Sequence, residues 1–214
     1  MLKVAPSILS ADFANMQKCV QDLKEWGADV VHCDVMDGVY VPNITFGMPM
    51  IKALRQHTDL PLDVHLMIVN PEKYVEKFCD AGADYVTFHP EVCANVENTL
   101  NLIRQKGKKC GLVVNANVDF EIVLPYLAQI DILLIMTVQA GFGGQSLIAE
   151  CLDKARRAKS LKERCGYRYE IEVDGGVGLQ NVAQCKDAGV DIVVAGSSIF
   201  NAENPEYAIA KMKI

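Results

Sequence analysis

Short, mainly apolar runs alternate with longer amphipathic segments along the whole chain. We predict strands at the runs, which cover residues 3–9, 29–35, 62–67, 85–89, 110–115, 132–138, 169–173 and 192–195. Runs of this length and apolar content are typical of parallel strands that are buried on both faces. Alternation of such strands with helices indicates the α/β class with one parallel sheet.

The intervening segments have the apolar period of helices. Within residues 15–26, Met16, Val20, Leu23 and Trp26 fall on one stripe. Residues 71–81 begin with a proline, which the first turn of a helix accepts, and residues 147–164 carry a dense charged face. All three segments are predicted helices.

A phrase of Gly, a small apolar residue and Asp recurs before three of the predicted strands, at 27–29, 82–84 and 189–191. Each glycine stands where a helix would end, because glycine adopts the left-handed conformation there at little cost. These recurrent corners and the count of eight strands favour a closed (β/α)8 TIM barrel over an open doubly wound sheet. No linker-like stretch divides the chain, so we expect one catalytic domain over residues 1–214.

The composition excludes several kinds of partner. A formal net charge of −6 provides no basic surface for nucleic acid. No apolar run approaches the roughly 18 residues that span a bilayer, and the segment after Met1 has no leader pattern. The eight cysteines include no Cys-x-x-Cys pair, which is typical of reduced thiols. We therefore expect a cytoplasmic protein without a nucleic acid or membrane partner.

Side chains that can bind a metal stand at the ends of predicted strands. His32 and Asp34 lie two apart at the end of the second strand, so both point to the same side. His65 ends the third strand and Asp174 ends the seventh. The carboxyl ends of barrel strands surround the usual active site. Two imidazoles and two carboxylates at this place are suited to one divalent ion, Zn²⁺, Fe²⁺, Mn²⁺ or Co²⁺.

Two other histidines and three methionines have less specific interpretations. His57 ends a helix and is expected to be solvated there. His89 ends the fourth strand, where a structural role and a functional role fit equally well. Met36, Met67 and Met136 are either core residues or a flexible apolar wall that excludes water from a carbanion-like intermediate.

Glycine-rich turns follow the last three predicted strands. Backbone N–H groups approach an anion closely where no Cβ intervenes, and the loops after strands seven and eight of such barrels often bind phosphate. The candidate residues are Gly141, Phe142, Gly143, Gly144, Gly175, Gly176, Gly196 and Ser197. We expect this part of the barrel mouth to bind a phosphate group.

These residues together resemble the ribulose-phosphate 3-epimerase family over essentially the whole chain. The resemblance is carried by APSILSADF at 5–13, HCDVMDG at 32–38, VPN at 41–43, DVHLM at 63–67, MTV at 136–138, GFGGQ at 141–145 and VDGG at 173–176. It implies a (β/α)8 barrel with one divalent metal bound by His32, Asp34, His65 and Asp174, and acid/base roles for the two aspartates. The substrate contacts that it implies come from Ser7, His65, residues 141–144, Gly175, Gly176, Gly196 and Ser197.

The reaction implied by the resemblance is inversion at C3 of a ketose phosphate, with D-ribulose 5-phosphate and D-xylulose 5-phosphate as the expected pair. One carboxylate removes the C3 proton, a cis-enediolate forms, and the other carboxylate returns a proton to the opposite face. This implies a place in the pentose phosphate pathway and a small ketose phosphate as ligand, and we expect a homo-oligomer. Two alternatives stay open: a hexulose-phosphate 3-epimerase acting on allulose 6-phosphate, and a metal-free phosphate-binding barrel.

The chain departs from the family pattern just before the GFGG loop. Gln139 and Ala140 stand where the family commonly has an acidic or variable residue followed by proline. Without the fixed φ of proline, the start of this loop should be looser. Loop order and fine substrate preference are the properties that this departure is expected to change.

Overall fold

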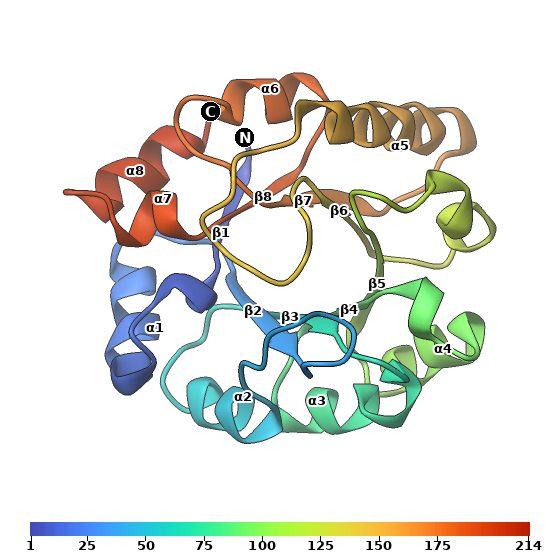
Figure 1. The fold of residues 1–214 in the computed structure, drawn as a ribbon, viewed down its shortest axis with the longest axis horizontal. Coiled ribbons are helices and arrows are strands. Elements are labelled where there is room, and N and C mark those ends of the chain that lie inside the picture. The colour runs from blue at the N-terminus through green and yellow to red at the C-terminus, as the bar shows by residue number, and fades with distance from the viewer.

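Eight parallel strands lie at the centre of the molecule, and helices surround them (Figure 1). The computed structural model describes residues 1–214. Its strands are β1 (Lys3–Pro6), β2 (Val31–Met36), β3 (Leu62–Met67), β4 (Tyr85–Phe88), β5 (Lys109–Val114), β6 (Ile132–Met136), β7 (Glu170–Asp174) and β8 (Ile192–Ala195). They pair in the order β1-β8-β7-β6-β5-β4-β3-β2, and a parallel bridge between Ser7 and His32 joins β1 to β2. The predicted (β/α)8 TIM barrel is therefore confirmed.

Helices cover the outside of the barrel between consecutive strands. The α-helices are α1 (Met16–Glu25), α2 (Met48–Arg55), α3 (Val75–Ala81), α4 (Val96–Gln105), α5 (Leu152–Cys165), α6 (Val182–Asp187), α7 (Ser197–Phe200) and α8 (Pro205–Met212). Between β5 and β6 the connection is a 3₁₀ helix, Phe120–Tyr126, which contains Pro125. Proline lacks the N–H that a continuous α-helix needs.

The strands and helices confirm the sequence pattern but not all of its boundaries. Strand β1 ends before the predicted residue 9, because the Ser7 hydroxyl accepts a hydrogen bond from the Leu9 N–H and starts a 3₁₀ turn. The predicted helix at 71–81 is wrong in its first turn. Pro71–Lys73 form a separate 3₁₀ turn, since Tyr74 has a φ of −125° and interrupts the helical path. The helix predicted at 147–164 likewise begins only at Leu152, after a 3₁₀ turn.

The repeated Gly-x-Asp phrase builds the same corner three times at the amino-terminal end of the barrel. The glycines at 27, 82 and 189 have positive φ values of 80°, 117° and 87°. The carboxylates of Asp29, Asp84 and Asp191 accept hydrogen bonds from the N–H groups of Val4, Leu62 and Ile171, at 2.8, 3.0 and 2.9 Å. At each corner, the aspartate just before a strand thus forms a hydrogen bond with the backbone of the preceding strand. These bonds stabilise the amino-terminal end of the barrel.

Apolar side chains form three separate clusters, the smallest of which has four residues. A cluster of 52 buried residues lies between the outer face of the barrel and the helices. A smaller cluster, which includes Met36, Met67 and Met136, lies inside the barrel near its carboxyl end. No helix combines the length and the apolar character that crossing a membrane requires.

Candidate active site and metal centre

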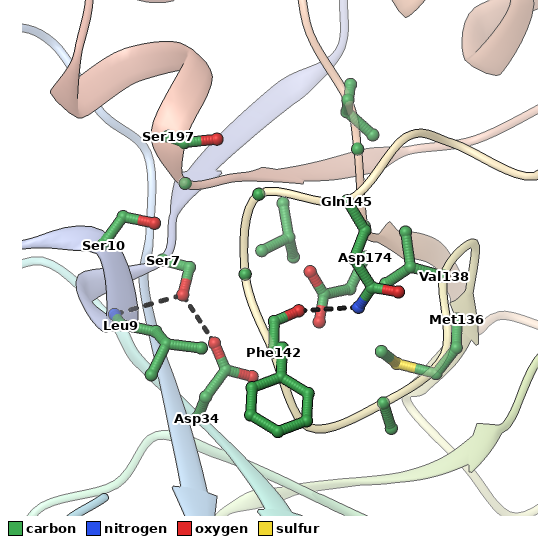
Figure 2. A pocket seen from close by; sticks show the side chains of 18 of the residues that line it. Ser7, Leu9, Ser10, Asp34, Met136, Val138, Phe142, Gln145, Asp174 and Ser197 are labelled. Atoms are coloured by element: carbon green, nitrogen blue, oxygen red, sulfur yellow. Dashed lines mark hydrogen bonds between the residues drawn. The ribbon is translucent and has the colours of Figure 1, made fainter. Parts of the chain in front are cut away.

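A cavity of about 250 Å³ opens at the carboxyl end of the barrel. Figure 2 shows Ser7, Ser10 and Ser197 on one side of it and Met136 on the other. Of the residues predicted for the site, those that line the cavity are Ser7, Asp34, Met36, Met67, Met136, Gly141, Phe142, Gly143, Gly144, Asp174, Gly175, Gly176, Gly196 and Ser197. His32 and His65 do not line it, because both are fully buried.

The four predicted metal ligands meet in space, although Asp174 is far from the others in sequence. One donor atom from each lies within 4.8 Å of all the others. Asp34 Oδ1 lies 3.3 Å from His32 Nε2 and 3.2 Å from His65 Nδ1. Asp174 Oδ2 lies 3.9 and 3.8 Å from the same two nitrogens. The arrangement could hold a metal ion between two imidazoles and two carboxylates.

The chemistry of these donors fits a divalent cation. His32 Nε2 is buried and has no hydrogen-bond partner. Buried polar atoms in proteins almost always have a partner, so an isolated imidazole nitrogen beside two carboxylates is explained if a cation binds there. The mixed nitrogen and oxygen set does not select one metal among Zn²⁺, Fe²⁺, Mn²⁺ and Co²⁺.

The predicted strand-end position is wrong for both histidines. His32 is the second residue of β2 and His65 the fourth residue of β3, and both strands continue to a methionine. His65 is the direct cross-strand partner of Asp34, which is the fourth of six residues in β2 and also lies before the strand end. Asp174, in contrast, does end β7 as predicted.

A second pair of carboxyl groups, which the sequence argument missed, lies beside His32 inside the barrel. Asp63 Oδ2 is 2.6 Å from His32 Nδ1, and Glu172 Oε1 is 3.8 Å from the same nitrogen. Both residues are fully buried. The sequence signal was available, because Asp63 and Glu172 each stand two residues before a predicted ligand on the same strand face. Metal-binding histidines usually donate their second N–H to such a group.

The two carboxyl groups at the cavity have pKa values shifted in opposite directions. Burial, together with the negative charge of Asp34, raises the pKa of Asp174 to about 6. Burial also disfavours ionised Asp34, but the adjacent imidazoles of His32 and His65 favour its charged form and hold its pKa well below the usual value. The two aspartates therefore differ in their affinity for a proton.

Ser7 also contacts this centre. Its hydroxyl donates a 2.5 Å hydrogen bond to Asp34 Oδ2 (Figure 2). Asp34 Oδ1 remains directed at the imidazoles. Ser7 thus orients the carboxylate at the seam between β1 and β2.

The glycines of these loops differ in what an added Cβ would contact. A Cβ on Gly176 would come 2.3 Å from the Leu147 nitrogen, so this glycine permits backbone packing. A Cβ on Gly196 would meet only side-chain atoms, the nearest being Ser10 Oγ at 2.5 Å, and one on Gly143 would lie 3.7 Å from the same oxygen. Ser10, which the sequence argument missed, therefore lies between two glycine loops and lines the cavity.

The loop that begins with the unusual Gln139 and Ala140 is held by side-chain hydrogen bonds. The Gln145 amide donates to the carbonyl oxygens of Gln139 and Phe142, both at 2.8 Å, and Figure 2 shows the bond to Phe142. The Asn43 amide donates to the Gly141 carbonyl at 3.1 Å. These contacts connect both ends of the loop without a proline.

The remaining histidines lie in different environments. His57 follows α2 and is exposed, as predicted. His89 is fully buried, with its Nε2 3.0 Å from the Nε2 of His65. Burial lowers the pKa of His89 to about 4.

Comparison with known proteins agrees with the site. A model of the ribulose-phosphate 3 epimerase family matches residues 3–200. Ribulose-phosphate 3-epimerase of Bacillus subtilis (strain 168) is 42% identical over 214 residues, which are 100% of this chain and 99% of that protein. The Synechocystis enzyme of the same name is 47% identical over 212 residues, or 98% of this chain and 92% of that protein, and the Escherichia coli K12 enzyme is 43% identical over 211 residues, or 98% and 94%.

Solved structures share the fold at low sequence identity. KGPDC from Streptococcus mutans has a TM-score of 0.73 at 13% identity and covers 100% of this chain and 96% of that one. A 3-hexulose-6-phosphate synthase has a TM-score of 0.67 at 19% identity and covers 99% and 97%. At this identity the likeness is one of fold alone.

The fold, the site and these relatives together define an isomerase of the epimerase kind. It is a barrel in which two carboxylates line a cavity and two buried imidazoles lie beside them. The chain belongs to the ribulose-phosphate 3-epimerase family.

Proposed function

We propose that this protein interconverts D-ribulose 5-phosphate and D-xylulose 5-phosphate by inverting the configuration at C3. One observation carries the proposal: the carboxylates of Asp34 and Asp174 come from separate strands and flank the same pair of imidazoles at one cavity. Inversion at a carbon requires a proton to leave one face and another to arrive at the opposite face. Two carboxyl groups at one cavity supply the two sites for that proton.

His32, Asp34, His65 and Asp174 would hold a divalent cation at this centre. When bound, the cation would stabilise the negative charge that develops on substrate oxygens as the C3 proton leaves. Asp63 supports the arrangement, since it accepts from His32 Nδ1 and leaves Nε2 available.

The two aspartates would exchange roles with the direction of the reaction. One carboxylate removes the C3 proton, while the other, in its protonated form, donates to the opposite face. The 2.5 Å bond from Ser7 holds Asp34 in a fixed orientation for this step. Met36, Met67 and Met136 line the cavity with their side chains almost fully buried, and they would exclude water from the carbanion-like intermediate.

The glycine loops after β6, β7 and β8 would bind the phosphate of the substrate through backbone N–H groups. Ser10 and Ser197 add hydroxyl groups to the same side of the cavity (Figure 2). A phosphate bound there contributes orientation, because it places C3 between the two carboxylates.

A hexulose phosphate such as allulose 6-phosphate needs the same centre and room for one more carbon. Comparative kinetics with ribulose 5-phosphate and allulose 6-phosphate, on protein of measured metal content, tests the proposal. We expect the larger kcat/KM for the five-carbon substrate, and a clear preference for the six-carbon substrate would contradict it. A fully active protein without a divalent ion would contradict the metal assignment. The homo-oligomer and the cytoplasmic location stay predictions.

A further inference from the structure

A chain of hydrogen bonds extends from His65 away from the cavity. His65 Nε2 lies 3.0 Å from His89 Nε2, and His89 Nδ1 lies 2.8 Å from the Tyr40 hydroxyl. The Tyr40 hydroxyl is in turn 2.7 Å from Glu91 Oε1. None of Tyr40, His89 and Glu91 lines the cavity that contains Asp34 and Asp174. Their hydrogen-bonded connection to the predicted metal ligands therefore passes through His65.

The positions of the protons along this chain follow from the chemistry of its last member. The Glu91 carboxylate only accepts, so the Tyr40 O–H donates to it. The Tyr40 oxygen then accepts from His89 Nδ1–H. A neutral imidazole has a single N–H, so the Nε2 of His89 is an acceptor and must receive its hydrogen bond from His65 Nε2–H. A neutral His65 that donates from Nε2 has no proton on Nδ1, the atom that lies 3.2 Å from Asp34 Oδ1.

The free nitrogen of His65 faces the other predicted metal ligands. Nδ1 lies 3.2 Å from Asp34 Oδ1 and 3.8 Å from Asp174 Oδ2. A metal binds the unprotonated nitrogen of an imidazole. The hydrogen bonds therefore place the His65 proton on Nε2, and the nitrogen that faces the other predicted metal ligands, Nδ1, is the unprotonated one.

We propose that His89 and Tyr40, anchored by Glu91, are positioning residues that hold His65 in its Nε2–H tautomer and present Nδ1 to the metal. The inference rests on the proposed function, because it needs the divalent cation between the four ligands. It adds a specific role for three residues that do not touch the substrate cavity.

The two metal-binding histidines are held in opposite tautomers by different means. His32 donates from Nδ1 directly to the Asp63 carboxylate, which leaves Nε2 free. Behind His65 stands another imidazole, that of His89, in place of a carboxylate. The Glu91 carboxylate lies on the far side of that imidazole, with its Oε1 3.4 Å from His89 Nδ1 and 2.7 Å from the Tyr40 hydroxyl. Without its acceptor, a buried His65 Nε2–H would be left unpaired, which is costly.

The test measures metal binding in the full-length protein by competition between Co²⁺ or Zn²⁺ and a chromophoric chelator. His89→Leu keeps a similar volume but removes both hydrogen bonds, and its metal dissociation constant should rise about 10- to 100-fold. His89→Gln can accept from His65 and donate to Tyr40, so it should stay within about threefold of the wild type. The Co²⁺ absorption spectrum should change in His89→Leu and not in His89→Gln.

Thr87→Val is the matched control. Thr87 lies in β4, two residues before His89, which follows the end of that strand. It is fully buried, and its hydroxyl has no hydrogen-bond partner. A nearly isosteric change at this depth should leave the metal dissociation constant unchanged. Circular dichroism and thermal unfolding establish that each variant is folded.

Unchanged metal affinity in folded His89→Leu, or no rescue in folded His89→Gln, would overturn the positioning role alone. A wild-type protein that binds no divalent ion would overturn the proposed function as well. If His89→Leu does not fold, long-range ¹H–¹⁵N spectra of the wild-type protein test the inference, because they report which ring nitrogen of each histidine is protonated. His65 with Nε2–H and His89 with Nδ1–H would support the inference, and His89 with Nε2–H would refute it.

Discussion

The Ser7 hydroxyl donates a 2.5 Å hydrogen bond to Asp34 Oδ2 across the seam that closes the barrel. Ser7 lies just after β1 and Asp34 is in the middle of β2, so the bond connects the first and last strands of the paired order. It occupies one carboxylate oxygen and leaves the other beside the two imidazoles. A contact that closes the fold therefore also orients a reacting group.

Removing this bond should reduce catalysis. A hydrogen bond to a charged group contributes about 1.5–3 kcal/mol, so Ser7→Ala is expected to lower kcat by about 10- to 100-fold. Steady-state kinetics at matched metal content measures the effect. A Ser7→Ala enzyme with normal kcat would show that Asp34 is oriented without Ser7.

The two imidazoles should be required for the metal and not for the fold. His32→Ala and His65→Ala are each expected to lose most of the bound divalent ion and most activity, because each removes one of four ligands. Elemental analysis reports the metal, and circular dichroism reports the fold. Unchanged metal content in both variants would refute the ligand assignment.

The two carboxylates should be separable by isotope exchange. Asp34→Asn and Asp174→Asn should each reduce epimerisation by at least about 10²–10⁴-fold, the usual contribution of a general acid or base. A single variant should still exchange the C3 proton with solvent at the face whose carboxyl group remains. NMR in D₂O detects this exchange. Metal content must be measured alongside, and near-normal turnover in either variant would contradict the two-base mechanism.

The phosphate site is best probed at Gly196, because an added Cβ there meets only side-chain atoms, those of Ser10 and, at 3.8 Å, Ser7. Gly196→Ala should raise KM for a phosphorylated ketose and lower kcat, since phosphate binding positions the reacting carbon. The unphosphorylated ketose should be affected much less. Equal losses for the two substrates would show that Gly196 serves the fold.

Ser10→Ala provides the control for this experiment. In the double variant with Gly196→Ala the steric contact is removed, so a recovery of kcat/KM would assign the loss to the displaced Ser10 hydroxyl. Gly176 is unsuitable for the purpose. An added Cβ there would strike the Leu147 backbone at 2.3 Å, and the residue has a φ of +68°.

Metal affinity should depend on pH through Asp174. Burial and the charge of Asp34 raise the pKa of Asp174 to about 6, and the metal needs the ionised carboxylate. Protons therefore compete with the metal as the pH falls through this value, and the dissociation constant should rise by up to about tenfold per pH unit below about 6. Chelator competition between about pH 5 and 8 measures the step. Asp174→Asn should remove that step, and its persistence would assign it to another group.

The sequence was sufficient for the architecture, because the signals for it are local. Runs of strand length, helical stripes and Gly-x-Asp corners each depend on neighbouring residues, and together they specify eight parallel strands. The boundaries were less predictable. The first strand stops where the Ser7 hydroxyl accepts from the Leu9 N–H, and the helix near residue 71 is interrupted at Tyr74.

For the site, the sequence by itself determined which side chains could bind a metal and on which strand face each one lies, since alternation along a strand is a local property. Only the tertiary structure decided how deep those side chains lie and what stands behind them. Asp63 and Glu172 beside His32, His89 beside His65, and Ser10 between two glycine loops are neighbours through strand pairing and barrel closure. Such contacts join residues far apart in the chain, and the strand register of the closed barrel, which no local pattern specifies, brings their side chains together.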